Sequence, residues 1–350
     1  MQLSLRQLIL PILLLIACAI PASASGITYF CDPSIGSAEC ATLNTTITGQ
    51  YDSTFSNANA SIYVTYGNTG LGSSTQYLNF VTYGAYRAAL TADSSGDAVD
   101  AAALVSLPSI EPALYGGGNI EVTSALISAL GLGTGAGSTS SLSFCGDPGG
   151  SGCYDGVITL ATPSIVAGYG DSYYYGNGPQ AGNSYNINSV IEHETDEILG
   201  TSSCVSTSGA SLADVCGGTN ASAVDLFRYQ APGTSVFEST TPGAYFSYSG
   251  GATNGADGAI YNTLSNGEDY ADFTQNCQFV QGADGCLGGT QYLTTDGGAE
   301  VNILDAVGYN LNEQPSADTP EPSSLLLSAT GLLGIFLFLR RKNHLSPVKF

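Results

Sequence analysis

The stretch IEHETDEILG, residues 191–200, is the strongest indication of what kind of protein this is. His193 and Glu197 stand four positions apart, so on a helix their side chains lie on the same face, one turn apart. That geometry allows both side chains to bind one metal ion, as the two histidines of an HExxH helix do. Zinc accepts carboxylate oxygen about as readily as imidazole nitrogen. The pattern therefore predicts a pair of zinc ligands, although glutamate replaces the second histidine.

The residues around this pair predict a general base and the two ends of the helix. Glu194 points to the adjacent face of that helix, where its carboxylate could accept a proton from a water on the metal. Ser189 and Glu192 match the S-x-x-E capping box that begins many helices. Gly200 stands where the helix is expected to end.

A solvated acidic helix is the competing interpretation of the same stretch. Several carboxylates crowd together between Glu192 and Glu197, and such helices are normal in a strongly acidic protein. In that interpretation His193 has no function. Against it, the other histidine of the chain, His344, lies in the C-terminal tail.

Both ends of the chain carry targeting signals. Residues 1–24 combine a basic start, an apolar stretch and an ASA cleavage site, which predicts a secretory signal peptide. The segment LIAC at 15–18 also fits a lipoprotein cleavage box. The C-terminal segment at 320–350 has three parts in order: Pro320, Glu321 and Pro322; an apolar run at 323–339; and Arg340, Arg341 and Lys342.

The C-terminal segment resembles the PEP-CTERM sorting signal of bacterial envelope proteins. The resemblance implies an exosortase-type sorting enzyme as a partner, and an exported protein of a Gram-negative-type bacterium that lies in the envelope or outside the cell. The alternative is a plain tail anchor, although the apolar run is shorter than the ~20 residues that a membrane helix usually needs. In either case the membrane is contacted only through the tail.

Between the two signals we expect one domain, residues 25–312, and a short linker, residues 313–319. Among all residues between the signals, only Arg87 and Arg228 are basic, against 28 acidic residues, which gives a net charge of −26. This charge excludes nucleic acid as a partner, because the phosphate backbone would be repelled. It suits cations, or solubility alone.

Eight cysteines remain once Cys18 leaves with the signal peptide, and they form four close couples. An even count in an exported chain implies disulfides. We predict nearest-neighbour pairing: Cys31 with Cys40, Cys145 with Cys153, Cys204 with Cys216, and Cys277 with Cys286.

Hydrophobic patterns predict a mixture of strands and helices without regular βαβ alternation, which indicates the α+β class. Strands are expected at 60–67, 155–161, 243–251 and 258–264. Helices are expected at 83–92, at 119–133 with an end at Gly131, and at 297–311.

Four segments in order, HETDEILG, VDLFRY, AYFSYSGG and ILDAVGYNL, carry a resemblance over about 188–311. They resemble a family of secreted bacterial proteins classed as metalloproteases, which often have PEP-CTERM tails. Members show an HExxE or HExxH helix with a trailing glycine, a later LDLFRY-type segment and a terminal LDVIGY-type helix. The resemblance implies that Glu197 is a normal family variant. It also implies a zincin-like, metzincin-like single domain with a mixed sheet and an active-site helix.

The third zinc ligand is expected outside the helix. The metzincin pattern HExxHxxGxxH would put it at Ser203, and serine is a poor zinc ligand. Asp225 in VDLFRY is the expected third ligand. Its competing role is a structural contact with Arg228, for which Asp305 is another candidate partner.

Other loop residues offer further candidates. Asp269, Asp272 and Asp284 are acidic residues in loops that could bind a metal, calcium included, although no D-x-[DN]-x-[DN]-G loop is present. Tyr309 is either a stabiliser of an oxyanion or a core residue.

Two functions follow from these patterns. The first is an exported, zinc-dependent peptidase that acts on a protein or peptide substrate, with Glu194 as general base. The second is a non-catalytic envelope or extracellular-matrix binding protein on a zincin scaffold. The Gly-, Ser- and Asn-rich composition and the missing third histidine favour the second.

Overall fold

The computed structural model describes residues 26–94, 97–107, 118–176, 179–205, 216, 221–236, 241–252, 259–263, 269–274, 277–294 and 298–312. The chain divides into two units, Met1–Leu311 and Asn312–Phe350, and the fold below is that of the first. The predicted signal peptide, the linker and the C-terminal segment with its apolar run lie outside the described residues, apart from Asn312 at the boundary. Within the described part, the helices are all too short or too polar to cross a membrane.

The main sheet has four strands, in the order β1 (Thr28–Cys31), β2 (Ser61–Gly67), β8 (Gly156–Ala161) and β3 (Ser74–Gln76). β1, β2 and β8 run parallel, whereas the edge strand β3 is antiparallel to β8. β2 and β8 are the strands predicted at 60–67 and 155–161. β8 is buried on both faces, which explains its almost continuous apolar sequence GVITLA.

A second sheet has the order β11 (Ala221–Ser222), β5 (Asn119–Thr123) and β4 (Leu78–Thr82). The helix predicted at 119–133 is therefore wrong in its first half. NIEVT forms β5, antiparallel to β4, because its three β-branched residues favour a strand. Only α6 (Ser124–Ala129) is helical, and it begins where the Thr123 hydroxyl accepts a hydrogen bond from the Leu126 amide.

Three small sheets contain the remaining strands: β6 (Ala136–Ser138) with β7 (Phe144–Gly146); β9 (Ser172–Tyr174) with β10 (Ser184–Asn186); and β12 (Arg228–Ala231) with β13 (Thr234–Ser235) and β14 (Tyr245–Phe246). The strand predicted at 243–251 is thus only two residues long. Gly250 and Gly251 adopt positive φ, which ends the extended backbone. Of the strand predicted at 258–264, Ile260 and Tyr261 form only isolated bridges.

The other helices, with the π- and 3₁₀-helical turns marked η, are α2 (Ser37–Thr42), η1 (Leu43–Ile47), α3 (Thr48–Thr54), α4 (Tyr83–Asp93), α5 (Ala98–Ser106), α7 (Pro163–Gly168), α8 (Ile187–Asp196), η2 (Glu197–Thr201), η4 (Val224–Phe227) and α9 (Ala299–Val307). α4 and α9 correspond to the helices predicted at 83–92 and 297–311. The mixture of these helices with the sheets agrees with the predicted α+β class.

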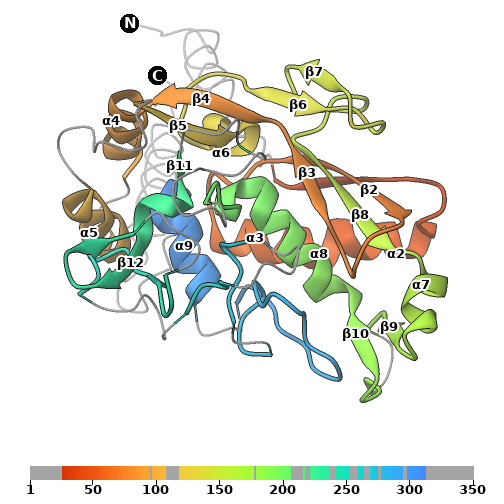
Figure 1. Ribbon diagram of the computed structural model, residues 1–350. Coiled ribbons are helices and arrows are strands. Elements are labelled where there is room, and N and C mark those ends of the chain that lie inside the picture. Colours follow the sequence, from red (N-terminus) through yellow and green to blue (C-terminus); the bar gives the residue numbers. More distant parts are fainter. Residues whose placement is uncertain are drawn as a thin grey trace, which may run out of the picture. The chain divides into compact units, whose positions relative to one another are not determined.

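α8 and η2 carry the IEHETDEILG stretch and lie in the middle of the first unit (Figure 1). The predicted capping box is wrong. The side chain of Asn186 caps α8 through the amide of Asn188, while the Ser189 hydroxyl donates to the carbonyl of Gln291. The helix therefore begins a full turn earlier than the sequence pattern indicates.

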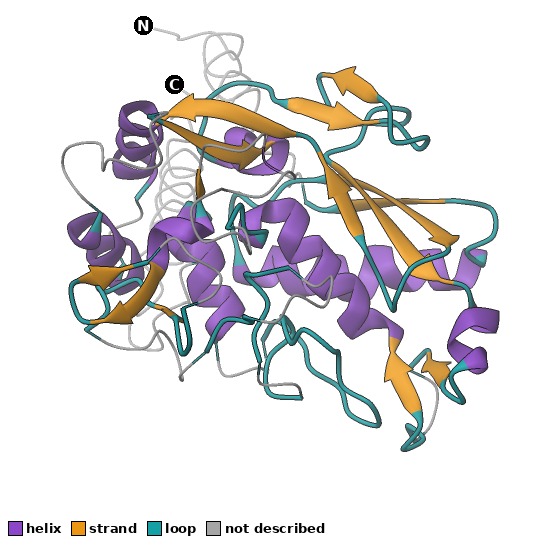
Figure 2. Ribbon diagram, in the orientation of Figure 1, coloured by secondary structure: helices purple, strands orange, loops and turns teal. Residues whose placement is uncertain are grey.

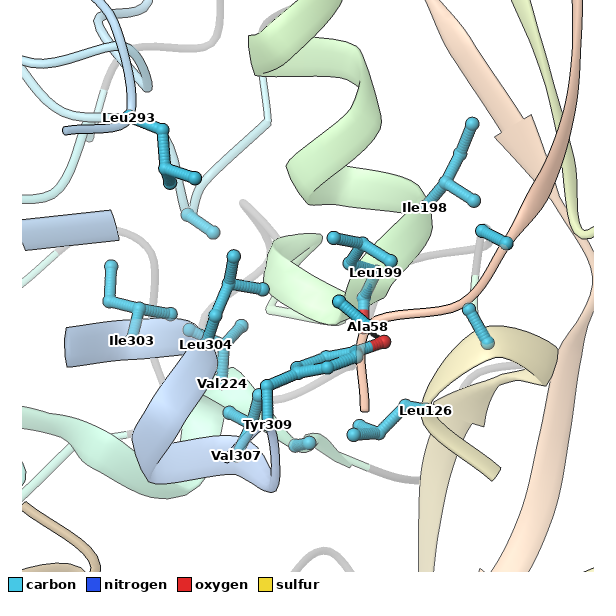
Figure 3. Packing of buried hydrophobic residues seen from close by; sticks show 14 of the residues in the cluster. Ala58, Leu126, Ile198, Leu199, Val224, Leu293, Ile303, Leu304, Val307 and Tyr309 are labelled. Carbon is cyan, nitrogen blue, oxygen red and sulfur yellow. Dashed lines mark hydrogen bonds between the residues drawn. The ribbon is translucent and has the colours of Figure 1, made fainter. Parts of the chain in front are cut away.

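Apolar residues anchor η2 in the core. Ile198 and Leu199 of η2 are fully buried, and the close-up shows Leu199 between α6, which carries Leu126, and α9, which carries Leu304 (Figure 3). Gly200 has φ 130°, a backbone conformation that favours glycine. This turn directs the chain out of the helix and fixes where Glu197 lies.

Loops rather than regular structure cover the outer side of α8 (Figure 2). The segment at 277–294 belongs to these loops and is bonded to the helix. The Gln281 side chain donates to the carbonyl of His193, and the Leu293 amide donates to the Glu192 carboxylate. The residues of the predicted metal helix therefore face an ordered loop.

The structure contains the four disulfides expected from the cysteine spacing: Cys31–Cys40, Cys145–Cys153, Cys204–Cys216 and Cys277–Cys286. Each closes a local loop. The Cys277–Cys286 bridge closes the loop that contains Val280 and Gln281, and both of these residues contact α8. Local disulfides of this kind limit how far such loops can spread.

Candidate metal centre

His193, Glu197 and Asp272 come together as one group. Each offers one ligand atom, and these atoms lie within 4.8 Å of one another. His193 Nε2 is 3.9 Å from Glu197 Oε1 and 3.5 Å from Asp272 Oδ1. The predicted pair is therefore joined by a carboxylate from a distant loop, which supplies the third potential ligand.

The imidazole of His193 is oriented by the loop that the Cys277–Cys286 bridge closes. Its Nδ1 lies 3.0 Å from the backbone carbonyl oxygen of Val280. A carbonyl oxygen can only accept a hydrogen bond, so Nδ1 carries the proton in the neutral ring. Nε2 is then left with its lone pair toward the two carboxylates, which is the tautomer that a metal requires.

Glu197 is held in place by the edge strand of the main sheet. Its Oε2 accepts a hydrogen bond of 2.5 Å from the hydroxyl of Ser74 in β3, while Oε1 faces His193. A nearby carboxyl, that of Asp269, has its pKa raised, first by burial and then by the charge of Glu197. Asp269 itself accepts hydrogen bonds from the amides of Ser203 and Ala271.

Asp272 is fixed through its backbone. Its carbonyl accepts a hydrogen bond of 2.6 Å from the Asn262 amide, and its amide donates to the carbonyl of Asp269. The next residue, Phe273, is bridged to Gly282, two residues beyond Val280. The segment that carries Asp272 is thus tied to the segment that orients His193.

This donor set fits a zinc ion. Two ligands that are 2.0–2.1 Å from a tetrahedral ion lie about 3.3 Å apart. The separations of 3.5 and 3.9 Å from His193 Nε2 are close to that value. One imidazole and two carboxylates is a set that zinc accepts, with a fourth position left for water.

Glu194 stands next to this group and lines a cavity of about 580 Å³. The cavity is also lined by His193, by Gly72 and by residues of the loop at 279–286. A Cβ atom on Gly72 would collide with the Glu194 carboxylate, so glycine is required for the carboxylate to lie where it does. The predicted general base therefore faces the same space as the predicted ligand.

The solvated acidic helix is excluded by burial. Glu192 and Asp196 are fully buried, and Glu194 is 5% exposed. Glu192 accepts hydrogen bonds from the Gln50 side chain and the Leu293 amide. Asp196 accepts a hydrogen bond from the Tyr51 hydroxyl. These acidic residues are internal acceptors that fix the helix.

Asp225, the expected third ligand, does not join the group. Its carboxylate accepts four hydrogen bonds: from the Ser203 hydroxyl, the Cys204 amide, and both the amide and the hydroxyl of Ser222. These bonds occupy both of its oxygens. Asp225 therefore braces the segment after η2, and Asp272 takes the place expected for it.

Arg228 has neither of its predicted partners at ion-pair distance among the described residues. It is buried, donates to the carbonyl of Tyr270, and stacks 4.2 Å above the ring of Tyr261. Burial lowers the pKa of Arg228, although the charge of Asp225 acts in the opposite direction. Asp305 lies instead beside other aspartates of α5 and its N-terminal cap.

Tyr309 is a core residue rather than part of the site. It is fully buried, its ring packs 6.0 Å from that of Phe55, and its hydroxyl donates to the carbonyl of Leu199 (Figure 3). This bond satisfies a carbonyl at the end of η2. The hydroxyl is therefore committed to the helix end and does not stabilise an oxyanion.

A second group of potential ligands, Glu121 with Cys204 and Cys216, is not a metal site, because the two cysteines form a disulfide. Nothing in the sequence pointed to three further residues at the metal centre: Ser74, Gly72 and Val280. A hydroxyl, a missing side chain and a backbone carbonyl belong to no ligand motif.

The comparisons with known proteins concern the C-terminus. Residues 318–342 match the PEP-CTERM protein-sorting motif, and this segment contains the predicted Pro320, Glu321 and Pro322. No curated protein and no solved structure matches the chain. The chain is therefore an exported protein of a Gram-negative-type bacterium, with a signal of the kind that exosortase-type enzymes recognise. The zincin-like fold stays a prediction.

Proposed function

We propose that this chain is an exported, zinc-dependent peptidase in which His193, Glu197 and Asp272 bind zinc and Glu194 is the general base. One observation carries the proposal. An imidazole nitrogen and two carboxylate oxygens converge next to a further carboxylate that lines a cavity. This combination is the one that hydrolysis by an activated water requires.

Zinc held by these residues would supply Lewis acidity and lower the pKa of a water molecule. The remaining tasks fall to the chain. The Val280 carbonyl keeps His193 in the tautomer that binds metal, and Ser74 fixes the Glu197 carboxylate. Two carboxylates supply more negative charge than two imidazoles would, so we expect the pH optimum to lie higher than for a three-histidine site.

Glu194 is placed to take a proton at the wall of the cavity and to return it to a leaving amine. The residue is 5% exposed, and its carboxylate lies next to Gly72. A cavity of about 580 Å³ lies within the range of known ligand pockets. Residues 69–73, from the segment that leads into β3, also line this cavity.

The decisive experiment compares the purified wild type with Glu194→Gln. Both proteins should contain about one zinc per chain by elemental analysis. Glu194→Gln should lose about 10²- to 10⁴-fold in the rate of peptide cleavage, because general acid–base catalysis contributes about that much. Asp147→Asn is the matched control, since Asp147 is exposed, does not line this cavity and belongs to no ligand group.

Two results would contradict the proposal. Carefully prepared protein without stoichiometric zinc would exclude the metal centre. Cleavage by Glu194→Gln at the wild-type rate would exclude the general base. A protein that holds zinc but cleaves neither casein nor a peptide library would instead favour the non-catalytic binding protein on a related scaffold.

A further inference from the structure

A second carboxylate cluster lies where α5 meets α9, and it shares no residue with the metal centre. Asp97, Asp100 and Asp305 each contribute one oxygen, and these oxygens lie within 4.8 Å of one another. Asp97 is the N-cap of α5, Asp100 is in the first turn of α5, and Asp305 is in α9. Three negative charges thus meet between two helices.

Asp305 is the unusual member of this cluster. It is 0% exposed, and neither of its carboxylate oxygens accepts a hydrogen bond from a described residue. Among the described residues, no arginine, lysine or histidine lies within ion-pair distance of it. The neighbouring Asp97 carboxyl could bond to it only if one of the two were protonated. Burying a carboxylate without a donor or a cation is costly.

The other two carboxylates are rigidly placed. Asp97 Oδ1 accepts hydrogen bonds of 2.8 and 2.9 Å from the amides of Val99 and Asp100, which caps α5. Asp100 is 2% exposed, whereas Asp97 is half-buried. Two of the three carboxylates are therefore buried, and the third, that of Asp97, is partly exposed.

Burial, together with the charges of Asp100 and Asp97, raises the pKa of Asp305 to about 8. The chain therefore has two ways to relieve the repulsion. Either a proton is shared inside the cluster, or a cation neutralises it. An ion would also satisfy the Asp305 oxygens, which accept no hydrogen bond from a described residue.

We propose that Asp97, Asp100 and Asp305 bind one Ca²⁺ ion that joins α5 to α9. A set made only of carboxylate oxygens suits a hard cation and lacks the nitrogen or sulfur that zinc and copper prefer. Calcium fits better than magnesium, because magnesium keeps most of its waters and two of these three carboxylates are buried. An exported protein meets calcium at concentrations that weak extracellular sites use.

The test uses the chelator-treated full-length protein, titrated with CaCl₂. Calorimetry should detect one Ca²⁺ per chain with a dissociation constant of about 10⁻⁴–10⁻³ M. The melting temperature should rise with the calcium concentration, because the ion binds only the folded state. Asp305→Asn should abolish both effects.

Asp147→Asn is the matched control, because it removes the same charge at an exposed position. It should keep the full calcium response. If Asp305→Asn does not fold, Asp97→Asn serves instead, since asparagine is also a good N-cap and the change leaves α5 capped. It should weaken calcium binding at least tenfold.

Glu197→Gln distinguishes calcium binding at this cluster from calcium binding at the metal centre. This variant should keep the full calcium response. Loss of the response in Glu197→Gln with retention in Asp305→Asn would overturn the proposal. If the wild type melts at the same temperature with and without calcium, the proposal is also overturned. The repulsion between the carboxylates is then relieved by a shared proton. An equal response to MgCl₂ would overturn the choice of calcium.

Discussion

Glu197 makes two different contacts with its two carboxylate oxygens. One carboxylate oxygen faces His193, and the other accepts a hydrogen bond from the hydroxyl of Ser74 in the edge strand. The glutamate links the potential ligand set directly to the main sheet.

Asp272→Asn should lower the affinity for zinc by more than about 100-fold. Changes in residues that only support a ligand already cost about 10- to 100-fold, and Asp272 lies at ligand distance itself. Competition with a chromophoric chelator measures the affinity. Asp284→Asn, on the nearby loop, should bind zinc as the wild type does. Equal affinities for all three proteins would show that Asp272 is not a ligand.

Sequence reasoning could place His193 and Glu197 because their spacing follows from the helix itself. It named Asp272 as one of three acidic loop residues that could bind a metal. It could not single out Asp272, because no spacing rule connects that loop to the helix. Asp225, the expected third ligand, instead accepts hydrogen bonds from four donors, and those donors come from residues that only the fold brings together.

α8 and η2 carry the site. Contacts at the C-terminal end of η2 fix their position as much as contacts at the start of α8. Gly200 turns the chain with φ 130°, and a Cβ there would lie 3.2 Å from Leu126. The Tyr309 hydroxyl bonds the carbonyl of Leu199 just before the turn. The position of Glu197 therefore depends on the backbone of the turn that follows it.

Gly200→Ala should lower the free energy of unfolding by about 1–3 kcal/mol, because alanine is strained at this φ and has little space. It should also weaken zinc binding. Gly49→Ala is the matched control: Gly49 is an exposed residue of α3 with open space around its Cα. That change should raise the stability by about 0.5–1 kcal/mol. Urea titration compares the two variants. A neutral Gly200→Ala would show that the turn is not constrained.

Among the helices and strands, the sequence predicted correctly those segments that follow one hydrophobic period. It failed where a segment combines two periods. β2 is rich in β-branched and aromatic residues, β8 is almost continuously apolar, and α9 has a clear helical period. The segment at 119–133 contains a strand and a helix in immediate succession, and the helical spacing of its second half hid the strand in its first half. The partner strand β4 decides that question, because every residue of β5 pairs with a residue of β4 in an antiparallel ladder.

Over the whole molecule, the interior contains many tyrosines whose hydroxyls bond to acidic or carbonyl groups. Tyr51 and Tyr309 are fully buried, and burial, together with nearby carboxylates such as Asp196, raises their pKa well above the usual value. The α+β class could be read from the sequence. The role of the tyrosines as internal donors to the acidic helix could not, because it depends on which side chains meet across the core.

Stability should fall steeply above pH 10. A tyrosine with a pKa that is higher in the folded state contributes stability that is fully present below pH 10, the unfolded value, and is lost as the pH rises above it. Each such group should cost about 1.4 kcal/mol per pH unit in that range. Urea midpoints between pH 9 and 11 measure the fall, and absorbance at 295 nm should show tyrosinate appearing together with unfolding. Gradual ionisation of all tyrosines in the folded protein would contradict this expectation.

The burial of Arg228 has a practical consequence for digestion with trypsin. Between the two terminal signals the chain offers trypsin only two bonds, after Arg87 and after Arg228. Arg228 is 1% exposed, and Arg87 lies within α4. The native protein should therefore survive trypsin intact in its central region, whereas the urea-unfolded chain should give three large fragments from the same region. Gel electrophoresis would turn this resistance into a simple assay of folding for every variant described above.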